Sequence, residues 1–235
     1  MTTLITHVWN EAALLPGWLD WHAPKFDRII AIDCASDDGT RDILADAGVE
    51  IVEGPDDFGA QRMDAAVMEV ERGVTGLRIA LNVTEFLLGK PNIPGQTYIP
   101  SVSLVNMADD PPFNWLGWWW TQRRHGIGWR DDFMHRRARL LTDHPVHYDI
   151  GRHFTQVSED APLLIVHVAN CLVDEAMIAR RLQIQHRIPE SDKQLNLSFQ
   201  HHDHGRGLTR ERLMAEQDEY RARATDLTDY FKGLA

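Results

Sequence analysis

The chain has 235 residues, 43% of them hydrophobic and 25% charged, with a formal net charge of −11. This composition is typical of soluble globular proteins, and the length is enough for one buried core. The acidic balance argues against a nucleic-acid partner, because such proteins neutralise phosphates with a basic surface. No apolar run approaches the ~20 residues of a transmembrane segment. The two cysteines, Cys34 and Cys171, are too few for a disulfide framework, so we expect a cytoplasmic protein.

The charge is distributed unevenly along the chain. Residues 1–120 contain 7 Lys/Arg and 18 Asp/Glu, whereas residues 121–235 contain 17 of each. Ten of the twelve histidines also follow residue 120. The first half is therefore acidic, and the second half is rich in Arg and His without being net basic.

The first ninety residues alternate apolar runs with stretches of helical periodicity. The apolar runs predict strands at residues 4–8, 28–32, 49–52 and 77–83. The helical spacing predicts helices at residues 12–22, about 40–47 and 58–72. Continuous apolar strands separated by helices are typical of βαβ units, so we predict an α/β fold whose mostly parallel sheet is flanked by helices.

After Lys90 the pattern changes, because prolines divide the chain into loops. Further strands are expected at residues 98–105, 139–148 and 163–168. From Asp174 the sequence is mostly helical, and Thr209 is expected to cap a final charged helix that runs towards Phe231. We expect one domain over residues 1–173, divided near residue 90, and a helical C-terminal extension over residues 174–235 that packs on it.

Polar residues follow three of the predicted strands. They are Asn10-Glu11 after the first, residues 33–40 after the second, and residues 82–85 after the fourth. In an open parallel sheet, ligands bind at the carboxyl ends of the strands. Asp33 ends a buried strand, where it either accepts hydrogen bonds from a base or ribose, or caps a nearby helix.

Four segments carry a resemblance to a known family. They are Asn10-Glu11-Ala12 with the following Leu15, Trp18 and His22; residues 32–40, reading IDCASDDGT; Gln61; and residues 81–87, reading LNVTEFL. In order and spacing the chain resembles family 2-like glycosyltransferases. The resemblance implies a GT-A-like (Rossmann-like) fold in which residues 1–90 form the nucleotide-binding half and residues 91–173 the acceptor half. It places the nucleotide at Asn10, Glu11, Asp33, Asp38, Gln61 and Asn82.

The same resemblance implies Mg²⁺ or Mn²⁺, which bridges the donor diphosphate in that family. The D-x-D motif that would hold the ion is degenerate here, because Asn82 and Thr84 stand where the family has aspartates and only Glu85 and Phe86 remain. A Thr hydroxyl is a weak ligand for a hard cation. Either Glu85 and a histidine, His167, hold the metal, or catalysis is metal-free, or activity has been lost.

The second half is expected to build the acceptor side. Asp131-Asp132, Glu159 and Asp160 are candidates for the general base, and the sequence does not choose between them. His153 is a further candidate ligand, and residues 201–204, reading HHDH, form either a metal cluster or a solvated loop. Arg123-Arg124 and Arg136, Arg137 and Arg139 either neutralise a diphosphate or lie on solvated strand edges. One or two of Trp115, Trp118, Trp119 and Trp120 are expected to line the acceptor cleft.

We therefore predict a glycosyltransferase that moves a sugar, with inversion, from a UDP- or GDP-linked donor to a glycan, lipid-linked or protein acceptor. The main alternative is a catalytically silent GT-A-fold module that binds a nucleotide sugar or a glycan. A metal-dependent hydrolase built on the histidines is a more distant alternative, and an oligomer is compatible with the sequence.

Overall fold

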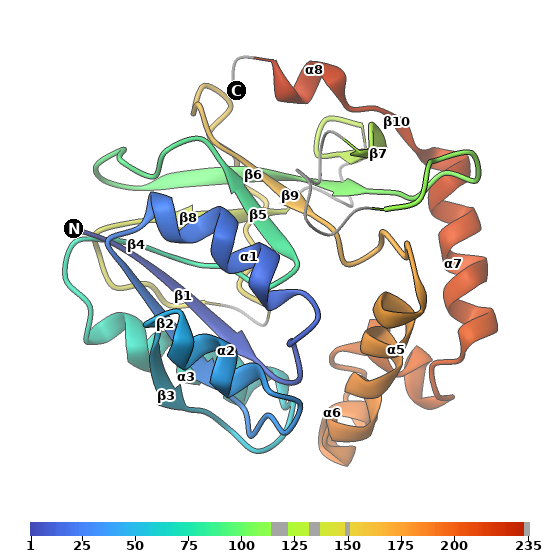
Figure 1. Ribbon diagram of the computed structural model, residues 1–235, viewed down its shortest axis with the longest axis horizontal. Coiled ribbons are helices and arrows are strands. Elements are labelled where there is room, and N and C mark those ends of the chain that lie inside the picture. Colours follow the sequence, from blue (N-terminus) through green and yellow to red (C-terminus); the bar gives the residue numbers. More distant parts are fainter. Residues whose placement is uncertain (114–121, 132–136, 149–150, 233–235) are drawn as a thin grey trace.

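The computed structural model describes residues 1–113, 122–131, 137–148 and 151–232 (Figure 1). Its first sheet contains β1 (Thr2–Val8), β2 (Arg28–Asp33), β3 (Glu50–Glu53) and β4 (Leu77–Ala80), in the order β3-β2-β1-β4. Every neighbouring pair in this sheet is parallel. The predicted α/β fold with a parallel sheet flanked by helices is therefore confirmed for this half of the chain.

Helices cover both faces of this sheet because alternate strand residues point to opposite sides. Leu4 and Val8 of β1 pack in one apolar cluster with residues of α1 (Leu15–His22) and α2 (Thr40–Asp46). Ile5 lies in a second cluster with residues of α3 (Ala60–Arg72). The sheet is thus buried on both faces, which explains why its strands read as continuous apolar runs.

The second sheet contains β5 (Glu85–Leu88), β6 (Thr97–Leu104), β7 (His125–Gly128), β9 (Leu164–His167) and the short β10 (Thr225–Asp226). Its order is β10-β7-β6-β9-β5, and β8 (Ala138–Leu141) pairs with β6. The β6–β9 pair is parallel and the others are antiparallel. The apolar run at residues 77–83 is not one strand, because the chain turns after Ala80 and begins β5 in the other sheet.

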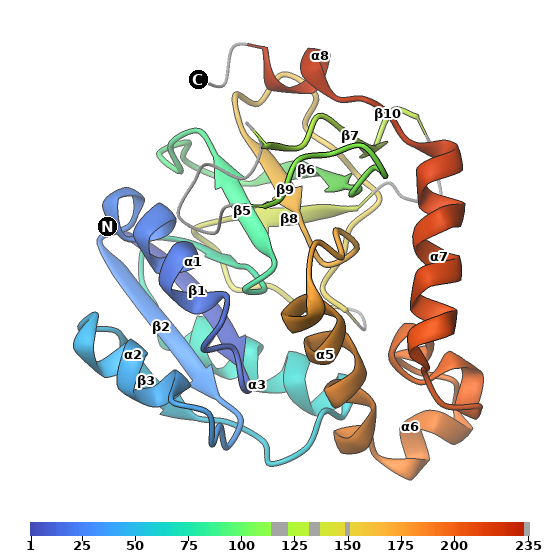
Figure 2. The same ribbon diagram turned by 45° about the vertical axis from the view of Figure 1, so that its right-hand side comes forward.

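The C-terminal region forms α5 (Glu175–Gln183), α6 (Glu190–Gln194), α7 (Arg210–Arg223) and α8 (Thr228–Phe231), which stand beside the sheets in Figure 2. Thr209 caps α7 as predicted, with its Oγ1 accepting the Arg212 N–H. The expected single helix towards Phe231 is divided, since the chain leaves α7 at Ala224 and adds β10 to the edge of β7. None of the helices in the described ranges is long and apolar enough to cross a membrane.

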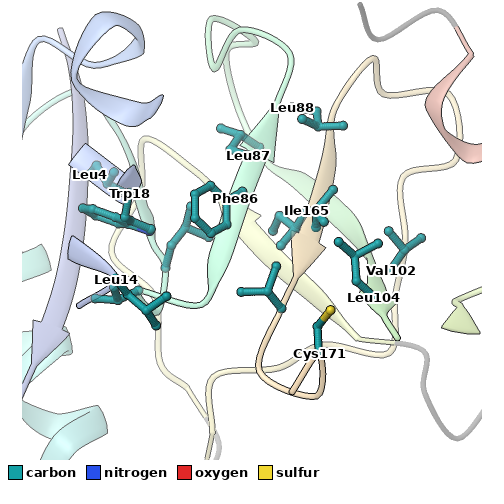
Figure 3. Packing of buried hydrophobic residues seen from close by; sticks show 14 of the residues in the cluster. Leu4, Leu14, Trp18, Phe86, Leu87, Leu88, Val102, Leu104, Ile165 and Cys171 are labelled. Carbon is teal, nitrogen blue, oxygen red and sulfur yellow. The ribbon is translucent and has the colours of Figure 1, made fainter. Parts of the chain in front are cut away.

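One apolar cluster joins the two sheets and the C-terminal helices. Trp18 of α1 and Phe86 of β5 lie side by side in it, with Ile165 of β9 beyond them (Figure 3). The indole N–H of Trp18 donates to the backbone O of Glu85 over 3.0 Å, which ties α1 to the second sheet. Met177 of α5 and Leu213 of α7 belong to the same cluster. The cluster therefore fixes the relative position of the segments that surround the site described below.

Candidate functional site

A cavity of about 180 Å³ lies where β1 and β9 end. His7 of β1 and His167 of β9 line it, together with Asn82 and Thr84 from the turn between the two sheets. Residues of α5, α7 and the turn at residues 199–201 close the other side. The cavity is therefore at the carboxyl end of a parallel strand, where ligands bind in open α/β sheets.

Arginines dominate the charge of this cavity. Arg137, which the sequence singled out, lines it together with Arg180 and Arg181 of α5. Arg152 lies directly behind the cavity wall, since its Nη2 donates to the Asn82 Oδ1 over 2.9 Å. Arg152, Arg180 and Arg181 were not predicted from the sequence, although residues 180–181 form a local basic pair. Such a group of guanidinium donors suits an anion, phosphate above all.

Four histidines, namely His7, His153, His167 and His201, also line the cavity. Burial lowers the pKa of His167 to about 4 and that of His201 to about 3, with nearby arginines contributing in the same direction. Burial and Arg152 hold the pKa of His7 well below its usual value, and burial and Arg139 do the same for the pKa of His153. All four rings are therefore neutral at pH 7 and can each donate one N–H.

Several buried nitrogen atoms of residues that line the cavity have no hydrogen-bond partner within the described part of the chain. They are the Nδ1 atoms of His153 and His201 and the Nε of Arg181. Buried polar groups in folded proteins are nearly always satisfied by protein, water or ligand. Several buried nitrogen atoms without a partner at one cavity therefore indicate that a polar ligand binds there.

The segment that resembles the D-x-D motif does not offer a metal site. Arg139 Nε lies 3.0 and 3.1 Å from the two carboxylate oxygens of Glu85, and the Asn82 N–H donates to the same carboxylate over 2.7 Å. Burial acts to raise the pKa of Glu85, but the Arg139 guanidinium and the other polar neighbours of the carboxylate together outweigh it and hold that pKa below its usual value. Glu85 faces His167 across the β5–β9 pair, yet its oxygens are already occupied.

The described residues contain no group of three or more His, Cys, Asp or Glu side chains arranged to hold a metal ion. The polar side chains of this segment that line the cavity belong to Asn82 and Thr84, whose amide and hydroxyl oxygens are neutral and weak ligands for Mg²⁺ or Mn²⁺. The donor set here thus does not fit the divalent ion that the family resemblance implies.

Three of the residues predicted to contact the nucleotide, Asn10, Asp33 and Asp38, instead bind other residues in and beside the loops after β1 and β2. Asn10 Nδ2 donates to the Asp37 carboxylate over 2.8 Å. The Asp38 carboxylate accepts from the Ala12 N–H and from the Thr40 N–H and hydroxyl. Asp33 is fully buried and pairs with Arg41 Nη1 at 2.7 Å. The structure brings these loops together beside the cavity, with their carboxylates engaged in holding the loops.

Glu11 and Gln61 are placed differently from each other. Glu11 lines the cavity and forms a bidentate pair with Arg180, at 2.6 Å from Nε and 2.5 Å from Nη2. Gln61 is exposed in the first turn of α3 and does not line this cavity.

The candidate general bases lie elsewhere. Asp131 Oδ2 accepts from the Gly128 N–H, the Thr225 hydroxyl and the Tyr230 hydroxyl, so it holds the C-terminal segment against β7. Glu159 and Asp160 are exposed in a turn. The carboxylates that do line the cavity belong to Glu11 and to Glu216 of α7, and the sequence analysis did not single out Glu216. Asp132 lies outside the described residues.

The other residues that the sequence singled out differ in whether they line the cavity. His201 lines the cavity, whereas His202 is buried against Leu197 O and the Gly205 N–H, and His204 is exposed. Arg123 is buried and pairs with Asp110 at 3.2 Å, away from the cavity. Arg136 and the tryptophans at 115, 118, 119 and 120 lie outside the described residues. The loop at residues 201–204 therefore contributes one histidine to the cavity.

No family model and no curated protein sequence matches this chain. Among solved structures, glucosyl-3-phosphoglycerate synthase from Mycobacterium tuberculosis, with Mn²⁺, UDP and phosphoglyceric acid, is 14% identical with a TM-score of 0.33, over 46% of this chain and 44% of that one. CTP:phosphocholine cytidylyltransferase from Streptococcus pneumoniae is 11% identical with a TM-score of 0.37, over 61% and 72%. The chain thus spans less than half the length of the synthase that it matches.

Proposed function

We propose that this chain is a glycosyltransferase that takes a sugar from a UDP- or GDP-linked donor and transfers it, with inversion, to a hydroxyl of a glycan, lipid-linked or protein acceptor. The observation that carries the proposal is the cavity at the end of β1, where Arg137, Arg180 and Arg181 converge beside histidine nitrogens that have no hydrogen-bond partner in the described part of the chain. The sequence resemblance to family 2-like glycosyltransferases supplies the class of reaction, since its four segments surround the same edge of the sheet.

In this proposal the donor diphosphate lies among the arginines. A diphosphate carries several negative charges, and each guanidinium presents two parallel N–H groups that match a phosphate in a bidentate geometry. The neutral histidine rings add N–H donors without adding charge. The site then stabilises the charge that develops on the leaving diphosphate as the sugar departs.

The same arrangement accounts for the altered D-x-D segment. Glu85 is held by Arg139, and Asn82 accepts from Arg152, so this segment presents no free carboxylate to the cavity, whose arginines are Arg137, Arg180 and Arg181. We propose that arginines neutralise the diphosphate in place of a divalent ion held at residues 82–85. The neutral, arginine-rich second half of the sequence supplies these groups.

Glu216 is the carboxylate that we assign as general base. It lines the cavity from α7, and its side chain is 23% exposed, with Oε2 3.4 Å from Arg181 Nη2. The acceptor O–H would give its proton to Glu216 as the oxygen forms a bond to the anomeric carbon and the bond from that carbon to the phosphate oxygen breaks. The nucleoside diphosphate leaves with the bonding electron pair.

A binding module without transferase activity is the second candidate. The observation in its favour is that Asp131, Glu159 and Asp160 do not line the cavity. Both candidates require that a nucleotide binds at the arginines, and they differ in turnover.

The test is calorimetric titration with UDP and GDP, followed by assays with a panel of nucleotide sugars, each with Mn²⁺ and with EDTA. We expect nucleotide binding, and turnover that persists in EDTA. Arg137→Gln should weaken nucleotide binding roughly tenfold through loss of a charge-assisted hydrogen bond. Arg72→Gln, at the exposed end of α3, is the matched control.

Glu216→Gln should lower turnover and leave nucleotide binding in place. Binding without turnover by the unaltered protein would favour the binding module. If neither nucleotide binds, both candidates fail.

A further inference from the structure

A second cavity, of about 230 Å³, adjoins the first one. Glu11 and Arg180 line both cavities, so their ion pair stands at the boundary. Each cavity alone is smaller than the roughly 300–1,000 Å³ of a typical small-molecule site. The two spaces would therefore accommodate a nucleotide-sized ligand only together.

The walls of the second cavity differ from those of the first. Ala176, Met177 and Ala179 of α5 line it together with Leu14, and the polar side chains of Asn10, Asp38 and Gln183 line it as well. Small apolar residues accompanied by a few polar side chains suit an uncharged, flat group that makes a few hydrogen bonds. The loops after β1 and β2, which border this cavity through Asn10 and Asp38, are the ones that the sequence associates with a nucleotide.

Of the two residues in the pair, Arg180 has the longer and more exposed side chain. The Glu11 backbone is fixed, since its N–H donates to the Thr40 hydroxyl over 2.8 Å and its carbonyl accepts from two N–H groups at the start of α1. Arg180 is a long side chain at the surface of α5, 14% exposed. A rotation of this side chain would separate the pair without moving the backbone.

We propose that the two cavities are parts of one nucleotide-binding cleft that the Glu11–Arg180 pair divides in the free protein. A ligand diphosphate in the first cavity takes the Arg180 guanidinium from Glu11, and the nucleoside then occupies the second cavity. This inference rests on the proposed function, because it assigns the two halves of the same nucleotide ligand to the two cavities. Carboxylate and phosphate compete here for one bidentate donor.

The competition has a direct consequence for affinity. Glu11 is 7% exposed, so a ligand that removes its cation must compensate for a buried, unpaired carboxylate. A bare diphosphate gains contacts in one cavity, whereas a nucleoside diphosphate gains contacts in both. Pyrophosphate should therefore bind much more weakly than UDP.

The first experiment removes the Glu11 carboxylate, which competes with phosphate for the Arg180 guanidinium. Pyrophosphate and UDP are titrated calorimetrically into the unaltered protein and into Glu11→Gln, Glu216→Gln and Glu175→Gln. Glu11→Gln should bind both ligands roughly three- to tenfold more tightly, because the binding-competent arginine is no longer occupied. Glu216→Gln removes one negative charge from the first cavity, as Glu11→Gln does. Glu175→Gln, on α5, breaks an exposed ion pair with Arg210 of α7. Both controls should change affinity less than Glu11→Gln.

The second experiment fills the second cavity. Ala179→Phe should weaken UDP binding at least tenfold and leave pyrophosphate binding unchanged, while Ala222→Phe, at an exposed position of α7, should alter neither. If UDP binds but Glu11→Gln does not tighten it, or Ala179→Phe does not weaken it, this inference is wrong and the proposed function stands. If neither ligand binds to the unaltered protein or to Glu11→Gln, the proposed function fails and this inference fails with it.

Discussion

The Glu85 carboxylate and the Arg139 guanidinium form a buried ion pair, with Nη2 2.9 Å from Oε1 and each side chain 3% exposed. Arg139 also donates to the backbone carbonyls of Gly151 and Arg152, so it joins β5 and β8 to the loop that carries Arg152. Glu85 lies in the segment that resembles the family's metal-binding motif, but here its carboxylate stabilises the part of the fold behind the cavity.

Removal of one partner from this pair should destabilise the fold. Glu85→Gln leaves the Arg139 guanidinium buried without its counter-charge, and breaking such pairs costs about 3–5 kcal/mol. Urea unfolding followed by tryptophan fluorescence measures the loss. Glu175→Gln, which breaks the exposed pair with Arg210, should cost less than about 1 kcal/mol. A comparable small loss for both variants would contradict a structural role for Glu85.

The free energy of unfolding should fall as the pH is lowered below neutrality, in part through His201. Burial lowers the pKa of His201 to about 3 in the folded protein, against 6.5 for an ordinary histidine. Between these values the unfolded chain binds a proton that the folded protein does not, so stability decreases as pH falls. From pH 7 to pH 5 this single group accounts for up to about 2 kcal/mol.

His201→Gln removes that contribution, and urea titrations at pH 7 and pH 5 give the difference. His144→Gln is the control, because His144 is 69% exposed. An unchanged pH dependence in His201→Gln would show that the ring is not kept neutral by burial.

Asn82→Asp should not create a manganese site. Arg152 Nη2 lies 2.9 Å from the Asn82 Oδ1, so a carboxylate introduced there pairs with that guanidinium. Titration of Mn²⁺ followed by electron paramagnetic resonance should give the same weak binding as the unaltered protein. Asn106→Asp, which adds the same charge beside Arg123 outside the cavity, is the control. Tight Mn²⁺ binding, or turnover gained only with Mn²⁺, would instead identify a metal site altered at position 82.

Gly126→Ala should destabilise the second sheet. A Cβ at this position would lie 2.2 Å from the Ser103 backbone oxygen and 2.7 Å from Leu227 Cδ1, so β6 and the C-terminal segment would have to move apart. Overpacking of this kind costs about 1–3 kcal/mol. Gly73→Ala, whose Cβ would meet its nearest atom at 3.5 Å, should be nearly neutral. Thermal unfolding of the two variants compares them, and equal melting temperatures would refute the close approach.

The sequence predicted much of the first half because local pattern and final environment agree there. Strands buried on both faces give continuous apolar runs, and each intervening helix shows its own apolar face. The same reasoning predicted a strand over residues 77–83 that is too long, because an apolar side chain does not reveal which of two sheets will bury it. The division after Ala80 depends on partners in β9, about eighty residues further along the chain.

By itself, the sequence determined the parallel sheet and the polar loops at its carboxyl edge. Only the tertiary structure decided which charges meet at that edge. Arg180 reaches Glu11 across 169 residues, and Arg152 reaches Asn82 across 70. Periodicity reports which face of an element is buried, whereas these pairs follow from the path of the chain between elements. The arginine-lined cavity is therefore a product of long-range packing.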